Sequence, residues 1–216
     1  MDSHSTSGGS GFARVVRTPV ALIRANRRPY LLLNSLAYGL LTLGLVLGAA
    51  FPGLNAALTG GMEESGTTDL VVSLLATPWL FALTITAVNL GRIALASIVL
   101  PSLVVPFAGI PVFCYFAVET GITLAPVDHA TTMTLIPHSV TMVVEFQAYV
   151  LLLLGAYILG RSWIRPSSVG AVTRGRGYLR GLQRLGWLAL PALALFVVGA
   201  IYEALSLTYL LPLLFT

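Results

Sequence analysis

Charged side chains are scarce in this chain. Only 9% of its 216 residues are Asp, Glu, Lys or Arg, whereas 56% are apolar. A soluble domain carries about 25% charged residues, which help to cover its surface. The composition therefore excludes an ordinary soluble domain and predicts that lipid is the solvent for most of the chain.

Lysine is absent, and Cys114 is the only cysteine in the sequence. A single cysteine excludes an internal disulfide and a cysteine metal cluster. The sequence also lacks G-x-S-x-G, H-E-x-x-H, a Walker-type loop and G-x-G-x-x-G. The net charge of +4 is concentrated in two segments instead of forming a basic surface. We therefore expect no enzyme activity, no cofactor, no metal and no nucleic-acid partner.

The amino-terminal segment differs from the remainder of the chain. Residues 1–11 are small, polar and rich in Gly and Ser, which predicts a flexible tail. Residues 12–28 mix apolar side chains with Arg14, Arg17 and Arg24. This pattern favours a basic amphipathic helix in the cytoplasmic interface of the membrane, and a plain positive flank of the first span is the alternative. Residues 29–216 are expected to form one membrane domain.

Apolar runs divide that domain into about five spans of roughly 20 residues each. The tract from Trp79 to Pro126 is too long for one span, and Pro101, Pro106 and Pro111 interrupt it near its middle. Pro137 is expected in the first turn of the fourth span, where no backbone amide is missed. The expected spans are residues 30–51, 79–100, 107–125, 137–160 and 185–211.

The arginines predict the orientation. Five precede the first span, and six lie in the polar loop Arg161–Arg184 between the fourth and fifth spans. The segments expected on the other side contain acidic residues and no Arg. Because cytoplasmic loops carry an excess of positive charge, both Arg-rich segments are expected inside. The sequence thus predicts an all-α helical bundle in the cell membrane, with its amino terminus in and its carboxyl terminus out.

Polar residues inside the expected spans form a candidate site. Arg92, Glu145 and Glu203 each lie within a span, where a charge needs a partner or a function. We expect a polar network of these three with Asn89 and with His138, which is two helical turns from Glu145. Arg92 is the expected partner of Glu145, and Glu203 is expected to meet His138 or Asn89. A transported ion or a proton relay is the alternative use of these residues.

Small residues in the first span predict close helix packing. Gly44 and Gly48 form a G-x-x-x-G pair, which lets two helix backbones approach closely. The pair is compatible with packing inside one chain and equally with a dimer face.

One stretch of the sequence resembles a known family. The segment IPHSVTMVVEFQAYVLLLLGAYILG has a Pro-His pair, then a Glu and a terminal Gly. It resembles the signature region of the stage II sporulation protein M family, and AIYEA is similar to the last helix of that family. The Glu follows the His by seven residues here, where the family has four, so the chain resembles a divergent member. The matching residues are Asn89, Pro137, His138, Glu145, Gly160 and Glu203.

The resemblance implies a multi-pass membrane protein that acts as a scaffold or assembly factor for other membrane proteins, without catalytic activity. We expect the lipid bilayer and membrane-protein partners or an oligomer as its interactions. The loop Arg161–Arg184 is expected to meet a cytoplasmic partner or anionic lipid. The alternative is a permease or transport subunit that uses the intramembrane Glu and Arg residues, with a separate ATPase partner.

Overall fold

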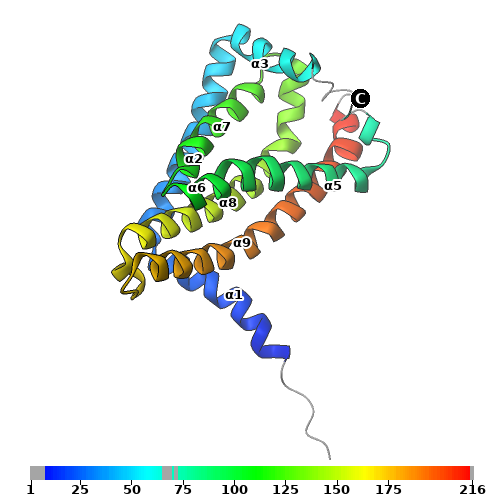
Figure 1. Cartoon of the computed structure of the whole chain (residues 1–216). Helices are drawn as coiled ribbons and strands as arrows, with labels where there is room; N and C mark the ends of the chain where they lie inside the picture. The colour runs from blue at the N-terminus through cyan, green and yellow to red at the C-terminus, as the bar shows by residue number, and fades with distance from the viewer. Residues whose placement is uncertain (1–7, 65–69, 71–72, 215–216) are drawn as a thin grey trace, which may run out of the picture.

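A computed structural model of the chain describes residues 8–64, 70 and 73–214 (Figure 1). The described part is all-α, as predicted, and contains no strand. Most elements are α-helices, with two π-helical segments and two short 3-10 turns. In chain order the elements are α1 Gly8–Ala25, α2 Arg27–Ala50, α3 Pro52–Glu64, α5 Pro78–Val88, η1 Asn89–Val99, α6 Leu100–Val104, α7 Gly109–Thr123, α8 His129–Ile164, η2 Pro166–Val169, α9 Arg174–Leu205, η3 Ser206–Leu210 and η4 Leu211–Leu214.

Four helices in the described part of the chain are long and apolar enough to cross a membrane. They are Arg27–Ala50, the continuous helix Pro78–Val104, Thr131–Ile164 and Arg174–Leu210. The third expected span, residues 107–125, corresponds to α7, an apolar helix of only 15 residues. These helices support the predicted membrane protein.

The starts of α8 and α9 differ from the prediction. α8 begins at His129, so Pro137 lies inside the helix and not in its first turn. The reason is a capping box, in which the Asp128 side chain accepts from the Thr131 amide at 2.7 Å. α9 begins at Arg174, so most of the expected Arg-rich loop is helical. The Thr173 hydroxyl accepts from the Arg176 amide there, which caps the helix.

The core surrounds the middle of α8. Residues 148–156 of this helix are all buried, whereas the exposed faces of α2, α5 and α9 are largely apolar. α8 packs along α9, and α7 packs along α2. Figure 1 shows α3 at one end of the bundle, with the loop between α8 and α9 at the opposite end. A helix buried all round and surrounded by helices with apolar outer faces is the arrangement expected in lipid.

The glycine pair of α2 packs within the chain. A methyl group at Gly44 would lie 2.8 Å from Cα of Gly121 in α7, and one at Gly48 would lie 2.5 Å from Cβ of Ala125. Neither distance is compatible with a real Cβ atom. The two glycines therefore serve the close approach of α2 and α7, and this contact decides between the two interpretations of the pair in favour of packing inside one chain.

A π-helical segment interrupts the helix that contains Asn89. η1 covers Asn89–Val99 and ends just before Pro101, whose ring removes a backbone donor from the next turn. Ser97 donates its hydroxyl to the Arg92 carbonyl at 3.0 Å. π-helical turns are rare and occur frequently at functional sites.

The amino-terminal helix leads away from the bundle (Figure 1). α1 begins at Gly8, inside the segment predicted as a tail, and residues 1–7 lie outside the described part of the chain. α1 is amphipathic and contains Pro19 within the helix. Leu22 and Ile23 near its end pack against the core of the bundle, and α1 also contacts α9.

Candidate functional site

Asn89 and Glu145 form the first polar pair of the candidate site. The Asn89 side-chain amide donates to Oε1 of Glu145 at 2.6 Å. Asn89 comes from the start of η1, and Glu145 comes from near the middle of α8. Gly199 of α9 lies opposite, where a methyl group would come within 3.0 Å of Cγ of Glu145. The missing side chain at Gly199 therefore leaves room for the carboxylate between three helices.

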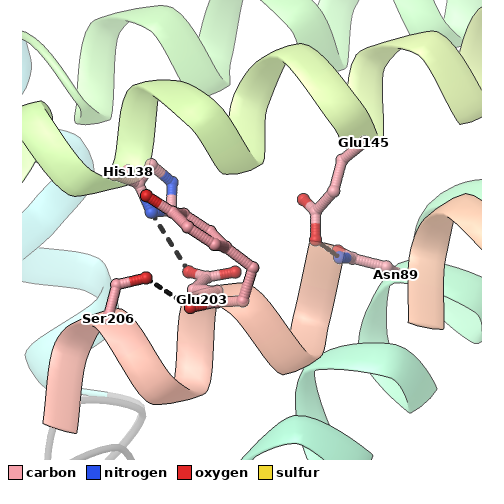
Figure 2. A network of polar contacts seen from close by, with 6 residues as sticks. Asn89, His138, Glu145, Glu203 and Ser206 are labelled. Atoms are coloured by element: carbon pink, nitrogen blue, oxygen red, sulfur yellow. Dashed lines mark hydrogen bonds and ion pairs between the residues drawn. The ribbon is translucent and has the colours of Figure 1, made fainter. Parts of the chain in front are cut away.

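His138 and Glu203 form the second pair. Nδ1 of His138 lies 3.1 Å from Oε1 of Glu203, and the two side chains are 18% and 14% exposed. Figure 2 shows His138 and Glu145 on the same side of α8, both directed towards α9. Of the two partners predicted for Glu203, His138 and Asn89, the structure shows His138. This contact is an ion pair when the histidine is protonated and a hydrogen bond when it is neutral.

Arg92 does not join these pairs, so the predicted contact between Arg92 and Glu145 is wrong. Arg92 is exposed, and no salt bridge links it to another residue in the described part of the chain. The prediction used only the difference in depth along the helices, roughly 8 Å, most of which an extended Arg side chain could cover. In the wider π turn the three-residue step covers less of a turn, so Asn89 points inward while Arg92 points outward.

A cavity of about 360 Å³ connects the two carboxylates. Its volume is within the range of small-ligand sites, about 300 to 1,000 Å³. Most of the wall is apolar, and the polar groups come from α5, η1, α7, α8 and α9. The polar residues that line it are Thr84, Asn89, Thr120, Thr123, His138, Glu145, Tyr149 and Glu203.

Tyr149 closes the deep end of this cavity. Its side chain is 1% exposed, and its hydroxyl has no hydrogen-bond partner in the described part of the chain. The ring packs against Phe196, with centroids 4.9 Å apart, and against Phe113 at 5.4 Å. Below it, residues 150–156 of α8 are buried. No residue of α8 beyond Tyr149 lines the cavity, so the cavity does not extend to the end that carries the basic loops.

The chemistry of the cavity wall suits a ligand that has both a polar group and an apolar body. Two carboxylates offer acceptors, and the apolar wall offers contact with hydrocarbon. No group of three His, Cys, Asp or Glu side chains among the described residues is placed to hold a metal ion. Ser206 lies near His138, but it donates its hydroxyl to the Tyr202 carbonyl (Figure 2). A serine nucleophile would instead donate to the histidine that acts as its base.

Several polar contacts were missed in the sequence. Gln147 of α8 donates to the Tyr30 hydroxyl at 2.6 Å, and Tyr38 donates to the Val143 carbonyl at 2.8 Å. Asn55, which is buried, donates to the Ile122 carbonyl at 2.7 Å. The sequence signal for these contacts is an amide or phenol side chain within or beside an apolar run, because such groups form hydrogen bonds when they are buried.

Comparisons with protein-family models, curated proteins and solved structures found no match to this chain.

Proposed function

We propose that this chain is a non-enzymatic membrane protein of about five spans, which acts as a scaffold or assembly subunit and binds a partner membrane protein at Arg92. The resemblance of its signature segment to the stage II sporulation protein M family supports the scaffold role. The absence of enzyme motifs from the sequence agrees with it.

α7 is the fifth span in this proposal. At its start, the ring of Phe107 lies beside Tyr157 near the Arg-rich end of α8, with centroids 5.9 Å apart. At its other end, the Ile122 carbonyl accepts from Asn55 of α3. A helix that reaches from one end of the bundle to the other supports five spans, with the amino terminus inside and the carboxyl terminus outside.

The single observation that carries the scaffold role is the exposed position of Arg92. It lies about midway along the 27-residue helix Pro78–Val104, on the outer surface of the bundle. An unpaired Arg at the centre of a span costs about 2.5 to 3.5 kcal/mol on insertion scales. The two carboxylates of the candidate site, Glu145 and Glu203, are engaged with Asn89 and His138 inside the bundle. A carboxylate on another protein would remove that cost.

The surface around Arg92 suits a partner helix. Gly91 and Ala96 are exposed beside it, and a methyl group at Gly91 would touch nothing within 4 Å. Small residues let a second helix approach closely in a membrane. We call this surface, made of Val88, Gly91, Arg92, Leu95 and Ala96, the Arg92 face. Its occupant is a spanning helix of a different protein that carries Asp or Glu at mid-membrane depth.

Replacement of Arg92 tests this proposal. The tagged chain, purified from native membranes in mild detergent, is expected to retain one membrane-protein partner. Arg92→Leu is expected to weaken binding of that partner at least about tenfold, which corresponds to 1.4 kcal/mol of binding free energy. Arg92→Lys should retain part of the affinity. The isolated Arg92→Leu chain should unfold at the wild-type temperature or above, because an exposed charge has been removed.

A matched control is Val46→Ala, which changes an exposed side chain on α2. This variant should retain the partner. Equal recovery of the partner with Arg92→Leu would contradict the docking face. Recovery of nothing except a second copy of this chain would identify a homo-oligomer and refute the heteromeric scaffold.

A transport subunit is the second candidate, because the cavity reaches both Glu145 and Glu203. A path across the membrane would have to continue past Tyr149 and its aromatic neighbours. That barrier favours the scaffold, and labelling on its two sides distinguishes the two functions, as described below.

A further inference from the structure

A second, larger hollow lies at the opposite end of the bundle from the carboxylate cavity. Its volume is about 1010 Å³. One wall comes from the junction of α1 and α2, and the other comes from the last turns of α8. Both walls carry guanidinium groups. The five arginines that line it are Arg24, Arg27, Arg28, Arg161 and Arg165, and we call this hollow the arginine pocket.

The positive charge of the arginine pocket is uncompensated. Its lining contains no carboxylate, and no salt bridge to any of its arginines is found in the described part of the chain. Asn26, at the turn between the two helices, uses its amide to donate to the Leu22 carbonyl at 2.9 Å, which fixes one wall. Five like charges around one hollow repel each other, so a bound anion stabilises this arrangement.

The flank of the pocket is apolar. Leu32, which is 70% exposed on the outer face of α2, lines it together with the buried Leu33 and the half-buried Tyr157. A ligand that fills the pocket therefore meets guanidinium groups at one end and a lipid-facing helix surface at the other. A phosphate head with hydrocarbon chains fits both parts.

We propose that the arginine pocket binds an anionic phospholipid that carries two phosphates, of the cardiolipin class, from the cytoplasmic leaflet. Arg binds phosphate oxygens in bidentate geometry, and five arginines on two walls exceed what one phosphate contacts. Basic pockets between spanning helices on the cytoplasmic side are suited to such head groups. This inference rests on the proposed orientation in the membrane but not on the partner at the Arg92 face.

The site differs from the expected anionic site in the loop Arg161–Arg184. Only Arg161 and Arg165 of that segment line the pocket, and Arg24, Arg27 and Arg28 supply the other wall. Arg174 and Arg176, at the start of α9, are exposed and outside it. This division provides matched variants with the same loss of charge.

The test measures lipid retention by the full chain. Delipidated protein in neutral detergent is titrated with cardiolipin, phosphatidylglycerol or phosphatidylcholine, and bound lipid is counted by native mass spectrometry. Wild type is expected to bind one cardiolipin at least tenfold more tightly than phosphatidylglycerol. Arg161→Gln with Arg165→Gln should weaken cardiolipin binding at least tenfold, and so should Arg27→Gln with Arg28→Gln from the other wall. Arg174→Gln with Arg176→Gln should retain wild-type binding.

Three results would overturn the inference. An equal loss of cardiolipin binding in the variant Arg174→Gln with Arg176→Gln would indicate that the lipid responds to total positive charge and not to a defined site. Equal affinity for phosphatidylglycerol would remove the preference for two phosphates. Displacement of bound cardiolipin by millimolar inorganic pyrophosphate would identify a soluble anion as the occupant. Alkaline extraction of the same variants reports membrane insertion, so loss of insertion contradicts the proposed topology, whereas intact insertion without lipid preference contradicts this inference alone.

Discussion

At the scale of single residues, the carboxylate of Glu145 depends on one amide. Asn89 donates to it at 2.6 Å, and the nearby walls of the cavity are mostly apolar. Removing one partner of a buried pair leaves the other without compensation, which costs more than the pair itself contributes. The pair therefore links η1 to α8 as long as both members are present.

Asn89→Leu is expected to destabilise the protein by about 1 to 3 kcal/mol, because it removes the donor to Glu145. The double change Asn89→Leu with Glu145→Leu should recover part of this loss, since no carboxylate then remains unpaired. Thermal unfolding in detergent micelles, followed by tryptophan fluorescence, measures both.

A control for this pair is Asn34→Leu, because the Asn34 amide donates to the Tyr30 carbonyl of its own helix at 2.9 Å. Its replacement should change the unfolding free energy by less than about 1 kcal/mol. Strictly additive effects of Asn89→Leu and Glu145→Leu would show that the two side chains do not interact.

The polar residues of the site could be predicted from the sequence, but their partners could not. An ionisable group in an apolar run is recognisable, which identified Glu145 and Glu203. Depth along the helices left His138 and Asn89 as alternative partners of Glu203, and the structure pairs Glu203 with His138. The partner of Glu145 could not be predicted, because the π-helical turn between Asn89 and Arg92 leaves only Asn89 directed inward, and the sequence carries no sign of that turn. Tyr149 was missed because a phenol within an apolar helix also fits an ordinary core position.

At the scale of elements, α2 and α7 are held together by the absence of side chains. Gly44 and Gly121 approach so closely that a methyl group on either would overlap the backbone of the other helix. Dispersion contacts between closely packed backbones are a main source of helix association in lipid, where the hydrophobic effect contributes little. This contact positions α7, whose Thr120 and Thr123 line the cavity.

Gly44→Ala is expected to destabilise the protein by about 1 to 3 kcal/mol through overpacking. The matched control is Gly39→Ala on the same helix, where a methyl group would touch nothing within 4 Å. That change should be neutral or slightly stabilising, because Ala has the higher helix propensity. Unfolding in detergent compares the two, and a neutral Gly44→Ala would contradict the close approach of α2 and α7.

The existence of the long helices could be predicted from hydropathy, whereas their ends could not. Apolar length fixes how much of the chain is hidden from water, and it identified the helices of the bundle. The length of an apolar run does not predict how far a helix continues into the polar residues beside it. α8 starts at His129 because Asp128 caps it, and α9 starts at Arg174 because Thr173 caps it. Caps of this kind act outside the membrane, where hydropathy gives no signal.

At the scale of the whole molecule, the two ends of the bundle differ in charge. The carboxylate cavity lies nearer the end that contains α3, and the arginine pocket lies at the other end. Between them, Tyr149 and the buried residues 150–156 of α8 form an apolar core. In the proposed orientation, the cavity faces outside and the arginine pocket faces the cytoplasm.

Labelling of single cysteines tests the orientation and the barrier together. In a Cys114→Ala background, Gly61→Cys on α3 and Thr84→Cys in the cavity wall should react with a small impermeant thiol reagent in intact cells. Ser168→Cys, which is exposed between α8 and α9, should react only after lysis. Leu152→Cys, buried below Tyr149, should stay unreactive in both cases because the aromatic cluster excludes the reagent. Labelling of Ser168→Cys from outside would refute the orientation. Labelling of Leu152→Cys from outside would show a path beyond Tyr149 and favour a transport subunit over a scaffold.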